Sequence, residues 1–163
     1  MESGCTLASA GWGNLGSAQR FSYSAIGNSV NLASRVEGLT KQYGARILVT
    51  EATYSGASDL AFLEADRVRV VGREQPVAVY ILLGNSEMAR SAAFRLVGEG
   101  HERLPDAYRR ADLYNPRSLL DQARAVAPEE TRELYNVYEE RLRAMERDPP
   151  LADWDGAFSA RQK

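Results

Sequence analysis

Residues 20–44 read RFSYSAIGNSVNLASRVEGLTKQYG and join a strand pattern to a helix pattern. Phe21, Tyr23 and Ala25 alternate with polar residues, which predicts a short strand with one apolar face. The chain then turns at Gly27, and apolar residues recur every three or four positions. This order predicts a strand, a turn and a helix, around which the rest of the chain is arranged.

The predicted helix begins at Asn28 and ends just before Gly44. The Asn28 side chain can accept a hydrogen bond from a free backbone N–H group of the first turn, and Gly44 suits a left-handed helix end. Asn31 and Arg35 are four residues apart, so they project from one face. An amide beside a guanidinium suits recognition of a phosphorylated sugar. From this spacing alone, two solvated surface residues are the commoner explanation.

A longer pattern surrounds this pair. It reads GNLGSAQRFSYSAIGNSVNLASRVEGLTKQYGARILVTEATY, in which a glycine-rich turn precedes the strand and Gly-Asn-x-Val-Asn-x-Ala-x-Arg opens the helix. From about Gly13 to Leu83 the chain resembles the second half of the class III adenylate/guanylate cyclase catalytic domain. A looser resemblance, to bacterial adenylate cyclases with a helical C-terminal tail, continues to the end of the chain.

The resemblance implies roles for four residues. Asn31 would orient the nucleotide ribose, and Arg35 would stabilise charge on the α-phosphate as it is attacked. Ser24 matches the position that reads the purine base, and a hydroxyl side chain there favours ATP as the substrate. The family often has a lysine where this chain has Val71, so Arg73 is the candidate for contact with the triphosphate. An exposed turn residue is the alternative role for Arg73.

The resemblance also implies a reaction, the conversion of ATP into cyclic AMP and pyrophosphate in intracellular signalling. The family uses two divalent metal ions, Mg²⁺ or Mn²⁺, held by two aspartates near the start of the catalytic domain. Here the first aspartate is Asp59, and the earlier carboxylates Glu2, Glu37 and Glu51 lie outside any matching motif. We therefore expect the C-terminal part of an adenylate cyclase that holds no metal and is inactive alone.

Two kinds of protein remain compatible with these residues. The first is part of an adenylate cyclase that pairs with a second copy or with another cyclase domain to bind ATP. The second is a non-catalytic, degenerate or regulatory cyclase-like module that binds a partner or a nucleotide.

The remaining chain before residue 85 predicts more sheet. Residues 46–50 read as a buried strand, and Thr50 is placed to cap a short helix after it. Two apolar segments, 61–71 and 76–83, flank the hairpin signal GREQ. The predicted class is α+β, a partial ferredoxin-like cyclase sheet with helices covering one face.

The composition changes after residue 84, where the chain becomes helical in character. We divide it into 1–84, the C-terminal part of a nucleotide cyclase catalytic domain, and 85–163, an α-helical C-terminal extension. The segment from residue 86 to residue 110 predicts one or two helices, with an interruption near Gly98 and Gly100.

Two further helices are predicted in the extension. Pro116 suits the first turn of a helix that runs through Val126, and Pro128 opens another. Apolar residues recur on the last helix at three- and four-residue spacing, as Leu134, Tyr138, Leu142 and Met145. We expect this stripe to pack on neighbouring helices, with a partner interface as the alternative. Trp154 follows in a capping segment.

Composition excludes several classes of protein. Of 163 residues, 44% are hydrophobic and 26% charged, as in ordinary globular domains, and the net charge of −2 gives no argument for nucleic acid or an anionic membrane. One cysteine, Cys5, excludes an internal disulfide, and one histidine, His101, excludes a histidine cluster. No apolar run approaches the ~20 residues of a membrane span. We expect a cytoplasmic location, either free or as the cytosolic part of a membrane-attached sensor.

Overall fold

The computed structural model describes residues 3–5, 11–14, 23–26, 28–69, 75–112, 116–151 and 154–159, with side chains from Asn31 onward. The strands are β1 (Ser3–Cys5), β2 (Gly11–Asn14), β3 (Tyr23–Ile26), β4 (Ile47–Thr50), β5 (Ala61–Arg69), β6 (Val77–Gly84) and β7 (Phe158–Ser159). The helices are α1 (Asn28–Tyr43), α2 (Glu51–Gly56), α3 (Ser86–Arg90), α4 (Ala92–Arg109), α5 (Pro116–Val126), the short 3-10 helix η1 (Glu129–Thr131) and α6 (Arg132–Arg147). The predicted α+β class with a helical C-terminal part is confirmed.

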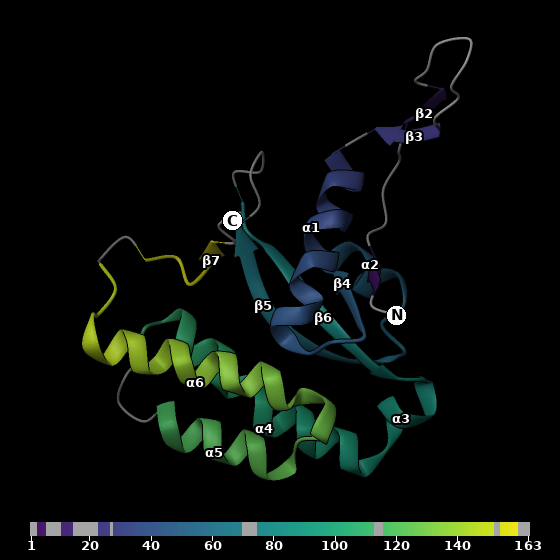
Figure 1. The fold of residues 1–163 in the computed structure, drawn as a ribbon. Helices are drawn as coiled ribbons and strands as arrows, with labels where there is room; N and C mark the ends of the chain where they lie inside the picture. Colours follow the sequence, from purple (N-terminus) through teal and green to yellow (C-terminus); the bar gives the residue numbers. More distant parts are fainter. Residues whose placement is uncertain are drawn as a thin grey trace.

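The strands form a mixed sheet and a separate hairpin (Figure 1). The five-stranded sheet has the order β1-β4-β6-β5-β7, with parallel pairs at its two edges and antiparallel pairs inside. β2 and β3 pair antiparallel, with Gly13 opposite Ser24, and lie beyond the N-terminal end of α1 (Figure 1). Only residue 27 separates β3 from α1, so the hairpin strand leads directly into that helix.

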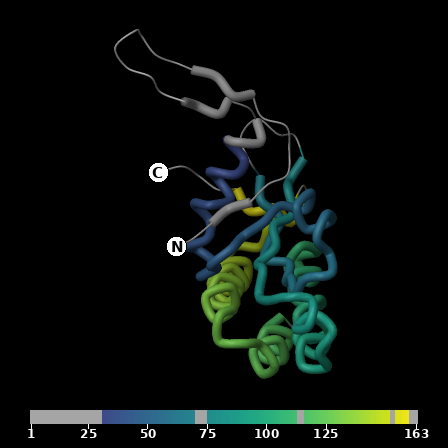
Figure 2. Tube along the Cα trace, turned by 90° about the vertical axis from the view of Figure 1, so that its right-hand side faces the viewer, coloured from purple at the N-terminus to yellow at the C-terminus, as the bar shows by residue number. Residues whose placement is uncertain are grey.

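Helices lie on both faces of the large sheet. α1 and α6 share one face, and the short α2 lies on the other (Figures 1 and 2). The coverage by α2 differs from the prediction of helices on one face only. Its physical reason is an aromatic contact, since Tyr54 of α2 stacks on Tyr80 of β6 with ring centroids 4.3 Å apart.

The C-terminal end of α1 follows the prediction from Gly44. This glycine has φ of 63°, which is the left-handed conformation that side chains disfavour. The Gly44 N–H donates to the Lys41 carbonyl at 3.4 Å, and the Ala45 N–H donates to the Thr40 carbonyl at 2.9 Å. This pair of bonds is a Schellman motif, which satisfies two of the last helix carbonyls. The helix begins at Asn28, but the side chain that we expected to cap it lies outside the described part.

The predicted strand, short helix and hairpin after α1 are also present, and the pairing of β5 with β6 shifts register in two places, between Ala61 and Phe62 and between Glu64 and Asp66. Thr50 occupies the N-cap position of α2, although its side chain makes no capping hydrogen bond. In the hairpin, Glu64 is opposite Tyr80 and Asp66 is opposite Val79, so β5 has an extra residue between them. This bulge lets consecutive residues, Ala65 and Asp66, both be buried. A charged side chain therefore enters the core.

The predicted interruption near Gly98 and Gly100 is wrong. Both glycines lie inside the 18-residue helix α4, and the break occurs earlier, at Ser91 between α3 and α4. The Ser91 hydroxyl accepts a hydrogen bond from the Phe94 N–H at 3.0 Å, which caps the new helix. Tertiary packing accounts for Gly100, which lies against Val126 at the end of α5, whereas Gly98 has no such neighbour.

The two later helices confirm the prediction. α5 runs from Pro116 to Val126, and the apolar stripe of α6 is buried. Trp154 packs edge-on against Tyr108 of α4, with ring centroids 5.7 Å apart. None of the helices in the described part of the chain is both long and apolar enough to span a bilayer.

One buried cluster combines both parts of the chain. It contains Leu39 of α1, Leu48 of β4 and Val79 of β6, together with Leu104 of α4 and Tyr138 of α6. The proposed boundary at residue 84 coincides with the end of β6. The division into two domains stays a prediction, while the core is continuous across it.

Gly98 and Gly100 provide a matched test of this packing. A Cβ atom at Gly98 would meet nothing within 4 Å, whereas one at Gly100 would lie 2.9 Å from Cγ2 of Val126. We expect Gly98→Ala to raise the free energy of unfolding by about 0.5–1 kcal/mol, the usual gain in a helix interior. Gly100→Ala should lack this gain because Val126 has to move. Urea unfolding of both variants measures the difference, and equal stabilisation would contradict the α4–α5 contact.

Candidate functional site

The candidate site begins on the exposed side of α1. Leu32, Val36 and Leu39 of this helix are buried against the sheet. Asn31 is exposed and Arg35 is half-buried, one turn apart on the same face. The helix therefore uses its apolar residues for packing and presents the predicted pair together, as the sequence spacing required.

The side chains of Asn31 and Arg35 are without hydrogen-bond or ion-pair partners among the described residues. Of the other 14 arginines whose side chains the structure describes, eight form ion pairs with carboxylates. A guanidinium carries five N–H donors in a fixed planar arrangement. Arg35 can therefore offer its donors to a ligand without first breaking a bond to another described residue.

The structure does not describe the side chains of the other two predicted site residues, Ser24 and Arg73. Ser24 lies in β3, close in sequence to the start of α1, but its side chain is outside the described part. Arg73 falls in residues 70–74, which connect β5 to β6 in the sequence and are also outside it. The roles of Ser24 and Arg73 therefore stay predictions.

The carboxylates of the described part do not gather into a cluster of three or more potential metal ligands. No group of three or more histidine, cysteine, aspartate or glutamate side chains with a suitable arrangement occurs in the residues that the structure describes. Glu37, Glu51 and Asp59 are exposed at separate places in the fold. These residues do not fit the two-metal centre of a class III cyclase, and we assign no step of the chemistry to a metal on them.

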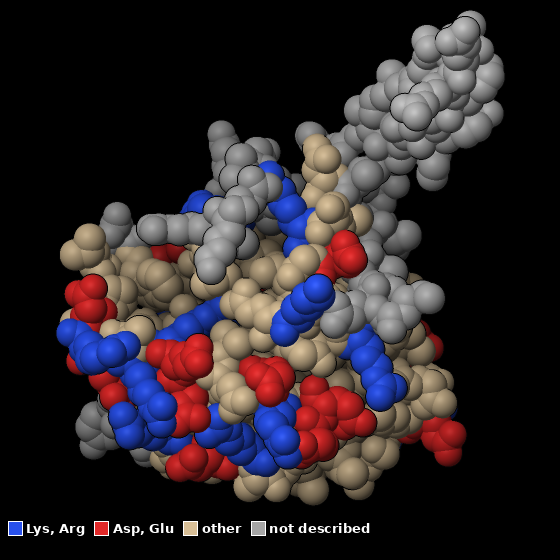
Figure 3. Space-filling view, in the orientation of Figure 1, with Lys and Arg blue, Asp and Glu red and all other residues tan. Residues whose placement is uncertain are grey.

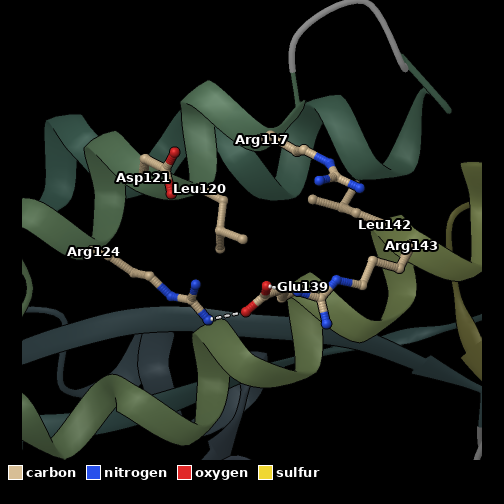
Figure 4. A pocket seen from close by; sticks show the side chains of 7 residues that line it. All are labelled: Arg117, Leu120, Asp121, Arg124, Glu139, Leu142 and Arg143. Atoms are coloured by element: carbon tan, nitrogen blue, oxygen red, sulfur yellow. Dashed lines mark hydrogen bonds and ion pairs between the residues drawn. The ribbon is translucent and has the colours of Figure 1, made fainter.

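A hollow lies elsewhere, between α5 and α6. Its volume is about 140 Å³, and Figure 4 shows Leu120 and Leu142 beside the charged side chains that line it. Arg124 donates to Glu139 at 2.7 Å there. The arginines around this hollow are paired with glutamates. In Figure 3, acidic and basic side chains also alternate over this end of the molecule. We therefore assign this hollow to helix packing.

A buried polar network joins three elements on the α1 side of the sheet. Asp66 is only 2% exposed and accepts a hydrogen bond from the Tyr43 hydroxyl at 2.6 Å. Its carboxylate also forms an ion pair with Arg141 at 2.6 Å. Burial raises the pKa of Tyr43 well above its usual value, and the adjacent Asp66 charge adds to this effect. Sequence analysis missed the network. The available signal was an aspartate within an apolar strand pattern.

His101 forms a second buried polar contact, between α4 and β5. Its Nε2 lies 2.7 Å from the Glu64 carbonyl and its Nδ1 lies 3.2 Å from the Tyr135 hydroxyl. The neutral ring fits both contacts if Nε2–H donates to the carbonyl and Nδ1 accepts from the tyrosine. Burial lowers the pKa of His101 to about 4, and the nearby Arg109 charge acts in the same direction.

This histidine predicts a pH-dependent stability. In the unfolded chain its pKa is about 6.5, so the unfolded state binds more protons between pH 6.5 and 4. The contribution of His101 is therefore complete above about pH 6.5 and is lost as the pH falls toward 4, by about 3 kcal/mol at most. Urea unfolding between pH 7 and pH 4 measures it. His101→Gln can still donate to the Glu64 carbonyl and should flatten the curve; an unchanged slope would contradict the assignment.

Part of this chain is similar in sequence to proteins that have been named. No family model matches the chain. It is 38% identical over 73 residues to "Adenylate cyclase" of Anabaena cylindrica, which covers 42% of this chain and 14% of that protein. It is 33% identical over 73 residues to "Adenylate cyclase 1" of Rhizobium meliloti (strain 1021), covering 44% of this chain and 11% of that protein.

Among solved structures, a bacterial light-regulated adenylyl cyclase is similar with a TM-score of 0.41 and 21% identity, over 53% of this chain and 43% of that chain. The chain spans no more than 14% of the two curated relatives named above. The curated matches support a class III cyclase-like domain over part of the chain, as the sequence predicted.

Proposed function

We propose that this chain supplies the ribose- and phosphate-binding side of a class III adenylate cyclase active site. The observation that carries the proposal is the pair Asn31 and Arg35, one turn apart on α1 and unpaired among the described residues. Relatives named as adenylate cyclases support the same assignment. ATP is the proposed substrate, and Ser24 is the proposed contact to its base.

The proposed chemistry requires a donor at the α-phosphate. The ribose 3′-oxygen attacks the α-phosphorus, the new O–P bond closes the ring, and the bond to pyrophosphate breaks while the 3′-hydroxyl proton leaves. Negative charge develops on the α-phosphate oxygens during this step. Arg35 can place a permanent cation there, and Asn31 can hold the ribose so that the 3′-oxygen is correctly aligned. Arg73 is proposed to contact the departing phosphates.

In this proposal the metal-binding side of the site comes from a second cyclase domain. The described residues hold no suitable carboxylate cluster, so a pair of identical chains would offer Asn31 and Arg35 twice. The same observation favours the second candidate, a non-catalytic module that binds a nucleotide or a partner. The two candidates differ in one measurable property, which is turnover after a complementary domain is added.

We therefore expect the purified chain to form no cyclic AMP from ATP and Mn²⁺ alone. The complementary partner is a class III cyclase domain that keeps both metal aspartates but has alanine in place of its own helix asparagine and arginine. Neither protein then has a complete site, and only the mixed pair should produce cyclic AMP. Metal-dependent synthesis by the chain alone would overturn the shared-site proposal. A mixed pair that binds ATP without turnover would favour the non-catalytic module.

A further inference from the structure

Arg141 of α6 lies where three separate elements meet. Its guanidinium pairs with Asp66 of β5 at 2.6 Å and donates to the Tyr43 hydroxyl of α1 at 3.3 Å. It also lies 4.2 Å from the ring centroid of Phe158 in β7. The Arg141 side chain is 12% exposed, so these contacts are made largely out of water. Burial opposes its charge, but the nearby Asp66, Tyr43 and Tyr108 together outweigh this effect and hold the pKa of Arg141 above its usual value.

The contact with Tyr43 fixes one end of the helix that carries the candidate site. Tyr43 is the last residue of α1, fully buried, and it also donates to Asp66. A second contact joins the same helix end to α6, because a Cβ atom at Gly44 would lie 2.8 Å from Cβ of Glu133. The C-terminal end of α1 is thus held by β5 and α6 together.

The position of this helix end determines where the other end lies. Asn31 lies twelve positions before Tyr43, which is ~18 Å along a helix that rises ~1.5 Å per residue. A tilt of roughly 5° about Tyr43 moves Asn31 by ~1.5 Å at that length. Displacements of ~1 Å at a reacting group can lower turnover ~100-fold. A small tilt of α1, caused by a change in the Tyr43–Asp66–Arg141 network, therefore becomes a large displacement of Asn31.

The C-terminal strand supports Arg141 from the other side. β7 pairs in parallel with the end of β5, with Val68 opposite Phe158, and Arg69 of β5 forms an ion pair with Asp155. The Asp155 carboxylate also accepts from the Ala157 N–H at 3.0 Å. The segment after α6 is therefore attached to the sheet at its β5 edge, where Phe158 covers the guanidinium of Arg141.

We propose that Arg141 is a positioning residue, through which α6 and β7 set the orientation of α1 and of the Asn31–Arg35 pair. This inference rests on the proposed function for its catalytic consequence, although the coupling between Arg141 and α1 stands on geometry alone. The helical C-terminal part then acts on the nucleotide site without contacting the nucleotide.

Three variants of the full chain and one control test the coupling. Tyr43→Phe removes only the hydroxyl and leaves the Asp66–Arg141 pair intact. Arg141→Lys keeps a cation near Asp66 but has no planar group to reach Tyr43 as well. Arg141→Met removes the charge. The control is Arg124→Met, which removes another ion pair of α6, the one with Glu139, without touching α1.

The first readout is hydrogen exchange of the α1 backbone, followed by mass spectrometry under conditions where each variant is folded. We expect faster exchange across α1 in Tyr43→Phe and in both Arg141 variants, and wild-type exchange there in Arg124→Met. Wild-type exchange in α1 of Tyr43→Phe and Arg141→Lys would overturn the coupling. This readout requires no activity, so it decides the coupling even if the cyclase proposal fails.

The second readout is cyclic AMP formation by the mixed pair defined above. We expect Tyr43→Phe to lower kcat about tenfold and Arg141→Met to lower it more. The kcat of Arg141→Lys should lie between those of these two variants, and Arg124→Met should retain the wild-type kcat. If the wild-type pair is active and Tyr43→Phe and Arg141→Lys match the control, the positioning role is wrong. If the wild-type pair is inactive, the proposed function fails, and hydrogen exchange alone decides the coupling.

Discussion

Replacing Arg35 with alanine is expected to lower cyclic AMP formation by the mixed pair ~10²–10³-fold, as loss of a preorganised donor to a developing charge usually does. The donor is preorganised here because Arg35 lies on a packed helix whose neighbours Leu32 and Val36 are buried. Folding should change little, since Arg35 forms no ion pair with the described residues. The assay is initial rate at saturating ATP and Mn²⁺, with thermal unfolding measured in parallel.

The matched control for this variant is Arg46→Ala. Arg46 is exposed and lies just after the C-terminal end of α1. Its replacement by alanine removes the same charge from the protein. We expect it to retain the wild-type rate. If Arg35→Ala and Arg46→Ala have equal, near-normal rates, Arg35 has no part in the reaction. An equal loss in both would indicate a general effect of charge instead of a contact to the α-phosphate.

The largest effect on stability is expected for Asp66→Ala. This change leaves the buried guanidinium of Arg141 without its carboxylate and the Tyr43 hydroxyl without its acceptor. Breaking a buried ion pair on one side typically lowers the free energy of unfolding by about 3–5 kcal/mol, because the remaining charge stays out of water. Urea unfolding at pH 7 measures the loss.

A double variant separates the unpaired charge from the lost volume. Asp66→Ala combined with Arg141→Met removes both charges, and an apolar replacement of a whole buried pair is often close to neutral. We therefore expect the double variant to be more stable than Asp66→Ala alone. A double variant with the sum of the two single losses would show that Asp66 and Arg141 act independently. That result would mean that the Asp66–Arg141 ion pair does not stabilise the core as a pair.

The sequence predicted the elements that depend on local signals. The end of α1 follows from Gly44, whose positive φ is required by the Schellman bonds. The α5 start follows from Pro116, and the buried face of α6 follows from the spacing of Leu134 and Tyr138. Asn31 and Arg35 come together for the same reason, because four residues make about one helical turn.

The sequence could not predict features that depend on distant residues. In a regular strand, consecutive side chains such as those of Ala65 and Asp66 point to opposite faces of the sheet. Only the bulge in β5 lets both be buried. The partner of Asp66 is Arg141, 75 positions away on a helix where an arginine reads as a surface residue. The expected interruption rested on the low helix propensity of Gly98 and Gly100, yet the helix continues through both, and only Gly100 lies against α5.

The long sequence separation within the Tyr43–Asp66–Arg141 network has a consequence for synthesis on the ribosome. Tyr43 and Arg141 are 98 positions apart, and the Arg69–Asp155 ion pair spans 86 positions. At the ~5–20 residues per second of translation, α1 waits roughly 5–20 s for the helix that holds its end. During that interval, the buried face shared by α1 and β5 lacks α6, which exposes apolar surface to chaperones or to another nascent chain. This part of the fold is therefore completed on the ribosome only after α6 and β7 have emerged.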